Sequence, residues 1–448
     1  MWRLHAARAL RPLSRWVPAL LLLYVALHPK SPYLIALRSV EAPLLVLLGG
    51  LVWWRARARC GRREGGLLGA VLLVVAILAV GNEAIFRRQR AEVLAADAAT
   101  RTLGQHFIVG YTRFDEVAKL AERGLIGGIY LGRANVRGRT LPAIRAEIDA
   151  LQGLRRRAGL PPLIVAADQE GGSVAHLTPP LAALPSLASV VDAGSDATLE
   201  TRVGEYGATQ GRGLAALGVN LNLGPVADLR PLHGGPAFDT HTLIRRRAIA
   251  ADPVLVNRVV GSYGAALMAQ GVRPTLKHFP GLGQVMSDTH HFPARLETPI
   301  ARLAAGDWQP FRGAVQSGAA IMLAHVVLPE IDPTLPASLS KDVVQGVLRK
   351  GWGFQGLLLT DDLNMGAVYR LGIGNAAVAA LDAGVDMLLI SYDPDQYYRA
   401  MHEAAEALRR GAFDPARLAA SRRRIAVAVG VAPGAVRVAA RMAEARPL

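Results

Sequence analysis

Three apolar runs dominate the first ninety residues of the chain. They cover residues 16–27, 42–54 and 65–80. A helix that crosses a bilayer needs about 20 mainly apolar residues, with roughly 17 as the lower limit. The third run reaches this length when it is extended through Phe86, whereas the first two are short without their flanks. The pattern predicts that residues 1–90 are a membrane-anchoring region with two to three transmembrane helices.

Basic residues gather on one side of these runs. They precede the first run and separate the second from the third, at Arg3, Arg8, Arg11, Arg15, Arg55, Arg57, Arg59, Arg62 and Arg63. Loops rich in Arg and Lys stay in the cytoplasm. We therefore expect a protein of the cell (inner) membrane, with everything after Arg90 facing the periplasm or exterior. A cleaved signal peptide at the first run is the alternative, but it leaves the later runs unexplained.

The pattern changes after about residue 100, where short segments rich in Val, Ile and Leu alternate with helical stretches. Eight candidate strands are His106–Gly110, Gly128–Leu131, Leu163–Ala167, Asn220–Pro225, Arg273–Lys277, Ala319–Leu323, Gly356–Thr360 and Asp386–Ile390. The candidate helices between and after them are Phe114–Arg123, Leu141–Ala158, Thr198–Leu217, Pro253–Gln270, Ala301–Ser317, Lys341–Lys350, Asn375–Ala383 and Asp395–Arg409. Several helices end in a glycine just before a strand, as helix C-caps often do.

Eight strand–helix units point to an α/β fold of the (β/α)8 TIM-barrel type over residues 91–448. An open, doubly wound sheet is the alternative. No GxGxxG or GxxxxGK[ST] follows a candidate strand, which argues against a dinucleotide or P-loop site. After residue 412 only a helical tail rich in Arg and Ala remains, so no further domain is expected.

Charge and cysteine content narrow the classes of partner. The 448-residue chain has a formal net charge of +16, but 14 of its 51 Lys and Arg residues and only three of its 35 acidic residues lie in the first ninety positions. The remaining sequence is nearly balanced, so the excess belongs beside the apolar runs and no nucleic-acid partner is expected. A single cysteine excludes an internal disulfide and a cysteine-based zinc site.

Ionisable residues collect where five of the eight predicted strands end. They are Asp168 and Glu170, Asp228, Lys277 and His278, His325, and Asp361 and Asp362. Catalytic groups of such barrels lie at this C-terminal end of the strands. An acid after a strand can also cap a helix or form a salt bridge, but five such strand ends favour an active site.

The segment KHFPGLGQVMSDTHH, residues 277–291, combines a cation, imidazoles and a glycine-rich loop. An Asp two residues before a His, as in Asp288 and His290, can fix the tautomer of the imidazole and raise its basicity. Metal binding by His278, His290, His291 and Asp288 is the competing use. Their spacing fits no zinc signature, so neither a metal nor a cofactor is expected.

At this point the sequence resembles glycoside hydrolase family 3, and within it the single-barrel β-N-acetylglucosaminidases. The matching segments run in family order over about residues 103–395. They are LGQHFIVGY, AADQEGG, ALGVNLNLGPVADL, IRRRAIAADP, KHFPGLG with DTH, IMLAHVVLPEIDP and GFQGLLLTDDLNMGAV.

The resemblance implies a role for each matching residue. Asp361 is the implied nucleophile, His290 the general acid/base and Asp288 its partner. The implied substrate-binding residues are Asp168, His176, Arg247, Lys277 and His278. Asp362 competes with Asp361 for the nucleophile, although helix capping suits it better, and Glu170 is expected to bond backbone near the Gly171–Gly172 turn.

Departures from the family pattern fall on the binding residues. Ser173 and His176 stand where the family has two arginines, of which the second contributes to substrate binding, so His176 is expected to bind more weakly. Leu282 replaces a polar loop residue, and RAIA replaces RSFG around Arg247. The resemblance therefore specifies the type of reaction more closely than the substrate.

These features together predict a membrane-anchored, retaining exo-β-N-acetylglucosaminidase that acts on cell-wall or chitin-derived glycans. Three alternatives stay open. A neutral histidine repels phosphate less than a glutamate does, so the enzyme could be a glycoside phosphorylase. It could be a family 3 glycosidase of other specificity, such as a β-glucosidase, and the altered DQEGGSVAH segment also allows a non-catalytic membrane glycan-binding protein.

Overall fold

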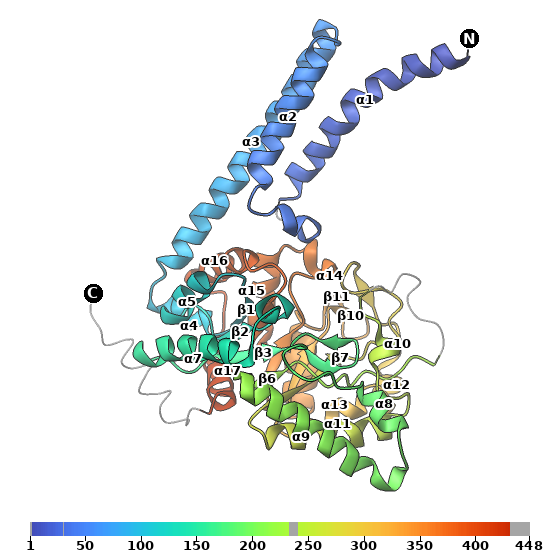
Figure 1. The fold of residues 1–448 in the computed structure, drawn as a ribbon, viewed down its shortest axis with the longest axis vertical. Helices are drawn as coiled ribbons and strands as arrows, with labels where there is room; N and C mark the ends of the chain where they lie inside the picture. Colours follow the sequence, from blue (N-terminus) through green and yellow to red (C-terminus); the bar gives the residue numbers. More distant parts are fainter. Residues whose placement is uncertain (1, 30, 233–240, 431–448) are drawn as a thin grey trace. The chain divides into compact units, whose positions relative to one another are not determined.

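The computed structural model describes residues 2–29, 31–232 and 241–430. The chain divides into two compact units, with the boundary between Glu92 and Val93. Figure 1 traces both units along the sequence.

The first unit contains three helices, α1 (Trp2–Leu27), α2 (Glu41–Arg57) and α3 (Arg62–Leu94), with a short 3₁₀ helix, η1 (Pro32–Leu37), after α1. Small and aliphatic side chains pack between them in two clusters, one around Ala19, Ala56 and Leu68 and one around Ala26, Leu45 and Val75. Their outer faces expose large apolar side chains, among them Leu21, Leu47, Leu67, Leu73 and Ile77. Helices that are apolar on both faces suit a lipid environment better than water.

Among the described residues, α3 is the helix long and apolar enough to cross a membrane by length and composition. The apolar part of α1, Ser14–Leu27, is shorter. The structure therefore supplies one helix of spanning length where the sequence predicts two to three.

The second unit is built around eight parallel strands. They are β1 (Phe107–Gly110), β2 (Gly128–Tyr130), β3 (Ile164–Ala167), β6 (Leu221–Asn222), β7 (Arg273–Phe279), β9 (Ala320–Leu323), β12 (Leu358–Thr360) and β13 (Leu388–Ile390). Each lies within or overlaps a strand predicted from the sequence. The sheet runs in the order β12-β9-β7-β6-β3-β2-β1-β13, and a bridge between Leu359 and Met387 joins its two ends. The strands thus form a nearly closed barrel, which decides against the open sheet.

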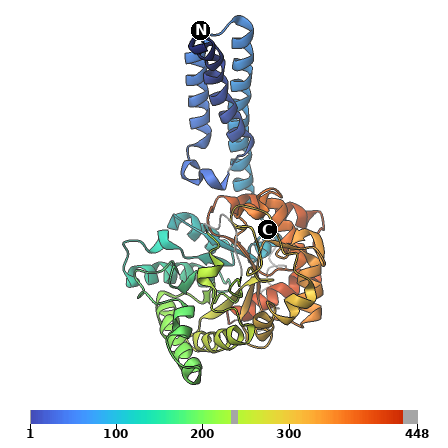
Figure 2. The same ribbon diagram turned by 90° about the vertical axis from the view of Figure 1, so that its right-hand side faces the viewer.

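Helices surround this barrel (Figures 1 and 2). The larger ones are α5 (Phe114–Glu122), α7 (Leu141–Arg157), α9 (Leu199–Leu217), α11 (Pro253–Met268), η3 (Asp342–Gly351, a π-helix), α15 (Ile373–Ala383), α16 (Gln396–Arg409) and α17 (Pro415–Ala428). The shorter ones are α4 (Ala98–Gly104), α6 (Arg133–Val136), α8 (Leu187–Asp192), η2 (Asp196–Thr198), α10 (Ile244–Arg247) and α14 (Gly366–Tyr369). The glycines predicted as C-caps, for example Gly218 and Gly384, have the left-handed backbone conformation that such caps require.

The helix predicted over Ala301–Ser317 is wrong in its continuity. It forms two short helices, α12 (Ile300–Ala305) and α13 (Gln309–Gly313). Gly306 leaves the helical conformation, with φ −130° and ψ −93°. The break lets Trp308 enter the core, and Gln284 donates a 2.8 Å hydrogen bond to the carboxylate of the buried Asp307.

Small pairings accompany the barrel. A hairpin joins β4 (Gln169–Gly171) to β5 (Val174–Ala175), and a three-stranded sheet contains β8 (Ala294–Arg295), β10 (Val326–Leu328) and β11 (Asp332–Pro336). These segments follow β3, β7 and β9 along the chain, so they belong to loops at the C-terminal end of the barrel strands.

The last described helix, α17, is part of the barrel unit and not a free tail. Its Ile425 packs into the interior cluster with Ile108, Met387 and Leu389. Asp386 accepts hydrogen bonds from Ser421 Oγ at 2.7 Å and from Arg424 Nε at 2.9 Å. An apolar contact and buried ionic contacts therefore fix α17 against the barrel.

Candidate active site

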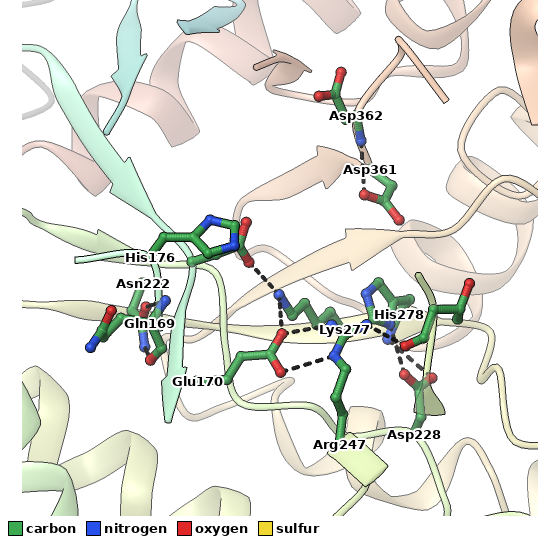
Figure 3. Close-up of polar contacts among 12 residues, drawn as sticks. Gln169, Glu170, His176, Asn222, Asp228, Arg247, Lys277, His278, Asp361 and Asp362 are labelled. Atoms are coloured by element: carbon green, nitrogen blue, oxygen red, sulfur yellow. Dashed lines mark hydrogen bonds and ion pairs between the residues drawn. The ribbon is translucent and has the colours of Figure 1, made fainter. Parts of the chain in front are cut away.

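Four charged side chains form one largely buried cluster at the C-terminal end of the barrel strands; Figure 3 labels three of them, Glu170, Lys277 and Arg247. Lys277, in β7, places its Nζ 2.5 Å from Asp168 Oδ1 and 2.7 Å from Glu170 Oε1. Arg247, at the end of α10, bonds both oxygens of Glu170, from Nε at 3.0 Å and from Nη2 at 2.6 Å. Two cations and two carboxylates balance one another, which offsets the cost of burying each charge. The structure thus brings three predicted substrate-binding residues together.

Glu170 has a different role from the one expected. Within the described ranges its carboxylate bonds Arg247 and Lys277, and not the backbone of the Gly171–Gly172 turn. Burial alone would raise its pKa, but the two cations lower the pKa of Glu170 to about 2. The local sequence predicts a turn at the two glycines. It cannot indicate contacts with Arg247 and Lys277, which lie 77 and 107 residues further along the chain.

The segment before Arg247 connects this cluster to the Asp288 loop. The Thr242 carbonyl oxygen accepts a 2.7 Å hydrogen bond from Arg247 Nη1, and the Thr242 hydroxyl donates one of 2.8 Å to Asp288 Oδ1. Thr242 is buried and was not singled out in the sequence. Thr242 comes near Asp288 only because two loops that are distant in the sequence approach each other. No short sequence motif contains both loops.

Asp288 and His290 are in contact, as the spacing predicts. Asp288 Oδ1 lies 3.1 Å from His290 Nδ1 and accepts a 3.0 Å bond from the His290 amide, while Oδ2 accepts one of 3.1 Å from the His241 amide. Burial would raise the pKa of Asp288, but hydrogen bonds from Thr242 and these amides lower it to about 2. The resulting carboxylate favours the His290 tautomer with the proton on Nδ1, which leaves Nε2 free for chemistry.

The two adjacent aspartates after β12 have different surroundings. In the described part of the chain, the Asp361 side chain accepts one hydrogen bond, of 2.8 Å, from the Asp362 amide. Asp362 instead accepts bonds from the Asn364 amide and side chain through Oδ1, and from the Ser391 hydroxyl and amide and the Tyr392 amide through Oδ2. It therefore ties the β12 loop to the β13 loop, which corrects the expectation that it caps a helix.

Electrostatics also separate these two carboxyl groups. Burial would raise the pKa of Asp361, but nearby His278, His325 and His290 lower it below its usual value. Burial raises the pKa of Asp362 to about 6. Asp361 is thus the more acidic of the two aspartates, and among the described residues only one of its carboxylate oxygens accepts a hydrogen bond.

Two buried histidines flank Asp361. His278 Nδ1 lies 2.7 Å from Asp228 Oδ2, and Asp228 also accepts bonds from the His278 and Leu282 amides. His325 lies between Ser338 Oγ at 2.7 Å and the Asp362 carbonyl oxygen at 3.0 Å. Asp228 fixes the orientation of His278. His278 and His325 both lie at the ends of predicted strands, and this position identifies them as candidate site residues in the sequence.

Tyr130 links His176 to the charged cluster, and the sequence analysis does not identify this tyrosine as a site residue. The Tyr130 hydroxyl lies 2.7 Å from His176 Nδ1 and donates a 3.1 Å hydrogen bond to Asp168 Oδ2. Tyr130 ends β2 and is nearly buried, and in sequence it reads as an ordinary strand aromatic. Because this hydroxyl bridges them, His176 and Asp168 are held in one hydrogen-bonded chain.

A family model and curated relatives assign the chain to the same family. Residues 100–428 match the glycosyl hydrolase family 3 N terminal domain. The chain is 35% identical over 272 residues to a beta-hexosaminidase of Xylella fastidiosa, which covers 60% of this chain and 76% of the relative. It is 34% identical over 276 residues to a beta-hexosaminidase of Neisseria gonorrhoeae, covering 60% and 72%.

Solved structures agree in fold. A glycoside hydrolase family 3 beta-N-acetylglucosaminidase from Paenibacillus sp. str. FPU-7 matches with a TM-score of 0.68 and 28% identity, over 78% of this chain and 64% of that one. A beta-N-acetylhexosaminidase from Beutenbergia cavernae matches with a TM-score of 0.66 and 29% identity, over 75% and 99%. From its family match and its barrel, the chain belongs to glycosyl hydrolase family 3 and is an enzyme of the glycoside hydrolase class.

Proposed function

We propose that the barrel, residues 91–448, removes terminal β-linked N-acetylglucosamine from cell-wall or chitin-derived glycans, through a covalent glycosyl intermediate on Asp361. The observation that carries this proposal is the contrast between the two aspartates. The pKa of Asp361 is lowered and one of its carboxylate oxygens accepts no hydrogen bond from the described residues, whereas the Asp362 carboxylate accepts hydrogen bonds through both oxygens from its own and the neighbouring loop. The name of the Xylella relative supports a hexosamine as the sugar, and that of the Paenibacillus structure supports N-acetylglucosamine.

His290 is the proposed general acid and base. A retaining glycosidase needs a proton donor for the departing oxygen and a nucleophile for the anomeric carbon. In its imidazolium form His290 gives its Nε2 proton to the leaving group while Asp361 attacks, which leaves the neutral ring with its proton on Nδ1; Nε2 then takes a proton from the water that releases the sugar. Asp288, held anionic at 3.1 Å from Nδ1, stabilises the imidazolium form, as a buried aspartate does in other catalytic pairs.

The charged cluster is the proposed sugar-binding site. Asp168, Lys277 and Arg247 offer acceptors and donors whose positions are fixed by one another, so hydroxyl groups meet preorganised partners. His278, whose orientation is fixed by Asp228, offers the sugar a further polar side chain. His176 supplies its contact through a neutral imidazole, because burial lowers its pKa.

The proposal is tested with the full chain, assayed on aryl β-N-acetylglucosaminide and aryl β-glucoside, each with and without phosphate. We expect rapid release from the first substrate, unchanged by phosphate. Asp361→Asn is expected to lower kcat by more than about 1,000-fold, as loss of a nucleophile does. Asp149→Asn, at an exposed position on α7, is the matched control.

Three results would count against the proposal. Undiminished release of the sugar by the Asp361→Asn variant would show that Asp361 is not the nucleophile. Sugar 1-phosphate formed at a rate that rises with phosphate would identify a phosphorylase. No turnover by the folded protein on either substrate would favour a glycan-binding protein or a different glycosidic specificity.

We further propose that residues 1–90 anchor the enzyme in the inner membrane, with the barrel on the periplasmic or exterior side. The spanning length of α3 and the outward-facing leucines of the three helices support this anchor. The distribution of arginines along the sequence supports its orientation.

A further inference from the structure

We propose that Tyr130 is a positioning residue that makes His176 a hydrogen-bond acceptor for a hydroxyl group of the terminal sugar. The inference rests on the proposed function, in which Tyr130 has no role so far. Tyr130 ends β2 and is nearly buried, while the His176 ring is half-buried beside the charged cluster. The Tyr130 hydroxyl has one proton and two close neighbours, one in Asp168 and one in His176.

The contacts of this hydroxyl determine where the protons lie. Tyr130 Oη is 3.1 Å from Asp168 Oδ2 and 2.7 Å from His176 Nδ1. Burial and the Asp168 carboxylate raise the pKa of Tyr130 well above its usual value, so the hydroxyl keeps its proton. Because a carboxylate only accepts hydrogen bonds, this proton points at Asp168. The hydroxyl oxygen is then the acceptor for His176, so His176 Nδ1 must carry a proton and donate it.

His176 is neutral in this arrangement. Burial lowers its pKa below the usual 6.5, and the cations Arg133 and Lys277 act in the same direction, against the carboxylates of Asp168 and Glu170. A neutral imidazole has one N–H group and one nitrogen that accepts. Since the N–H group is at Nδ1, Nε2 carries a lone pair, and in the described part of the chain Nε2 has no hydrogen-bond partner.

The residues on both sides of Tyr130 are held in place. Asp168 Oδ1 lies 2.5 Å from Lys277 Nζ, so Lys277 and Tyr130 each fix one oxygen of this carboxylate. The His176 amide donates a 3.0 Å hydrogen bond to the Asp168 carbonyl oxygen. The buried Gln169 side chain accepts a 3.0 Å hydrogen bond from the amide that follows His176. A sugar hydroxyl therefore meets Nε2 at a position that is fixed before binding.

This arrangement reverses the hydrogen-bonding character of position 176. An arginine, which the family pattern has there, is a cation that only donates hydrogen bonds. Neutral His176 accepts a hydrogen bond and offers no charge to a carboxylate or phosphate group of a glycan. The hydroxyl groups of an uncharged terminal sugar supply the donor that Nε2 needs, so we infer that position 176 selects for such a sugar.

The position of the proton on His176 is tested by magic-angle-spinning NMR of the full chain in lipid bilayers, with ¹⁵N-labelled histidine. Spectra of the His176→Gln variant identify the His176 signals by their loss. At neutral pH we expect a proton on Nδ1 and none on Nε2, and a change of this pattern in Tyr130→Phe. A proton on Nε2, or on both nitrogens, in the unaltered chain would overturn the proposal.

The effect on binding is tested by steady-state kinetics on aryl β-N-acetylglucosaminide. Tyr130→Phe should raise KM by about 3–10-fold, the loss expected for one hydrogen bond, and change kcat by less than about 3-fold. Tyr111→Phe is the matched control, because Tyr111 is a buried tyrosine directly after the neighbouring strand β1 whose hydroxyl bonds Glu147 of α7. An unchanged KM in Tyr130→Phe, or a loss confined to kcat, would contradict the positioning role.

Deoxyfluoro substrates identify the hydroxyl group that reaches Nε2. Fluorine cannot donate a hydrogen bond, so replacing that hydroxyl should raise KM of the unaltered chain by about 3–10-fold. The same replacement should cost nothing further in His176→Ala, which has no acceptor there. Equal losses in both proteins at each of the three hydroxyl positions of the sugar would overturn the contact. The NMR measurement needs no turnover, so a failure of the proposed function is distinguished from a failure of the assigned tautomer.

Discussion

At the residue scale, the site depends on pairs of charges that hold one another in place. Asp168, Glu170, Lys277 and Arg247 form one neutral cluster, and Asp228 and Asp288 each orient a histidine. The sequence motifs identified the residues that are proposed to contact substrate. They did not identify the contacts made by Glu170, Thr242 and Tyr130, because those partners are distant in the chain and have no local pattern.

Glu170 leads to a prediction about pH and stability. Its pKa is lowered to about 2 in the folded protein, from an ordinary value of 4.5. A lowered carboxyl pKa stabilises the fold above the unfolded value, and this contribution is lost as pH falls from about 4.5 towards 2. Glu170→Gln should therefore lower the free energy of unfolding by about 3 kcal/mol at pH 7, because two buried cations lose their partner.

Urea unfolding at pH 7, 5, 4 and 3.5 measures this difference, which should shrink at the lowest pH values. Glu297→Gln, whose side chain is 70% exposed and paired with Arg295, serves as control and should change stability by less than about 0.5 kcal/mol. A deficit in Glu170→Gln that stays the same across this pH range would show that the carboxylate charge is not responsible.

At the scale of elements, alternating apolar strands and helices predicted the barrel well. All eight strands lie within or overlap their predicted ranges, because parallel strands that are covered on both faces are nearly continuous apolar runs. The break between α12 and α13 was missed because Gly306 and Asp307 are tolerated in a helical pattern. Tertiary contacts of Trp308 and Asp307 decide the local conformation there.

Helix α17 provides a test at this scale. Ile425 is 7% exposed and packs against the barrel interior, so Ile425→Ala should lower the free energy of unfolding by about 2–5 kcal/mol through lost burial and the cavity left behind. Val427→Ala, at a 56% exposed position of the same helix, should change it by less than about 0.5 kcal/mol. Equal effects of the two substitutions in urea unfolding would show that Ile425 of α17 does not pack into the barrel interior.

At the scale of the whole molecule, an apolar helical unit precedes a family 3 barrel. Apolar runs predicted the helices of the first unit, and α3 has the length to span a bilayer. Composition cannot settle how many helices span, because short apolar helices can also pack against one another, as Ala19, Ala56 and Leu68 do.

Cys60, the single cysteine of the chain, reports on the orientation. It lies between α2 and α3 in an arginine-rich loop that is predicted to be cytoplasmic. In spheroplasts that make the full chain, a membrane-impermeant maleimide should label Cys60 only after permeabilisation. In Cys60→Ser carrying Ser195→Cys, at an exposed position of the barrel unit, labelling should occur in intact spheroplasts. The reverse pattern would contradict the proposed orientation.

Covalent trapping on Asp361 tests the central claim of the proposed mechanism most directly. The full chain is incubated with a fluorinated N-acetylglucosaminyl donor that slows release of the sugar, and the protein is then digested and its peptides are analysed by mass spectrometry. The mechanism predicts one sugar per chain, attached to the Asp361 carboxylate, and no adduct in Asp361→Asn. An adduct on Asp362 or another residue, or turnover of the donor with Asp361 unmodified throughout, would contradict it.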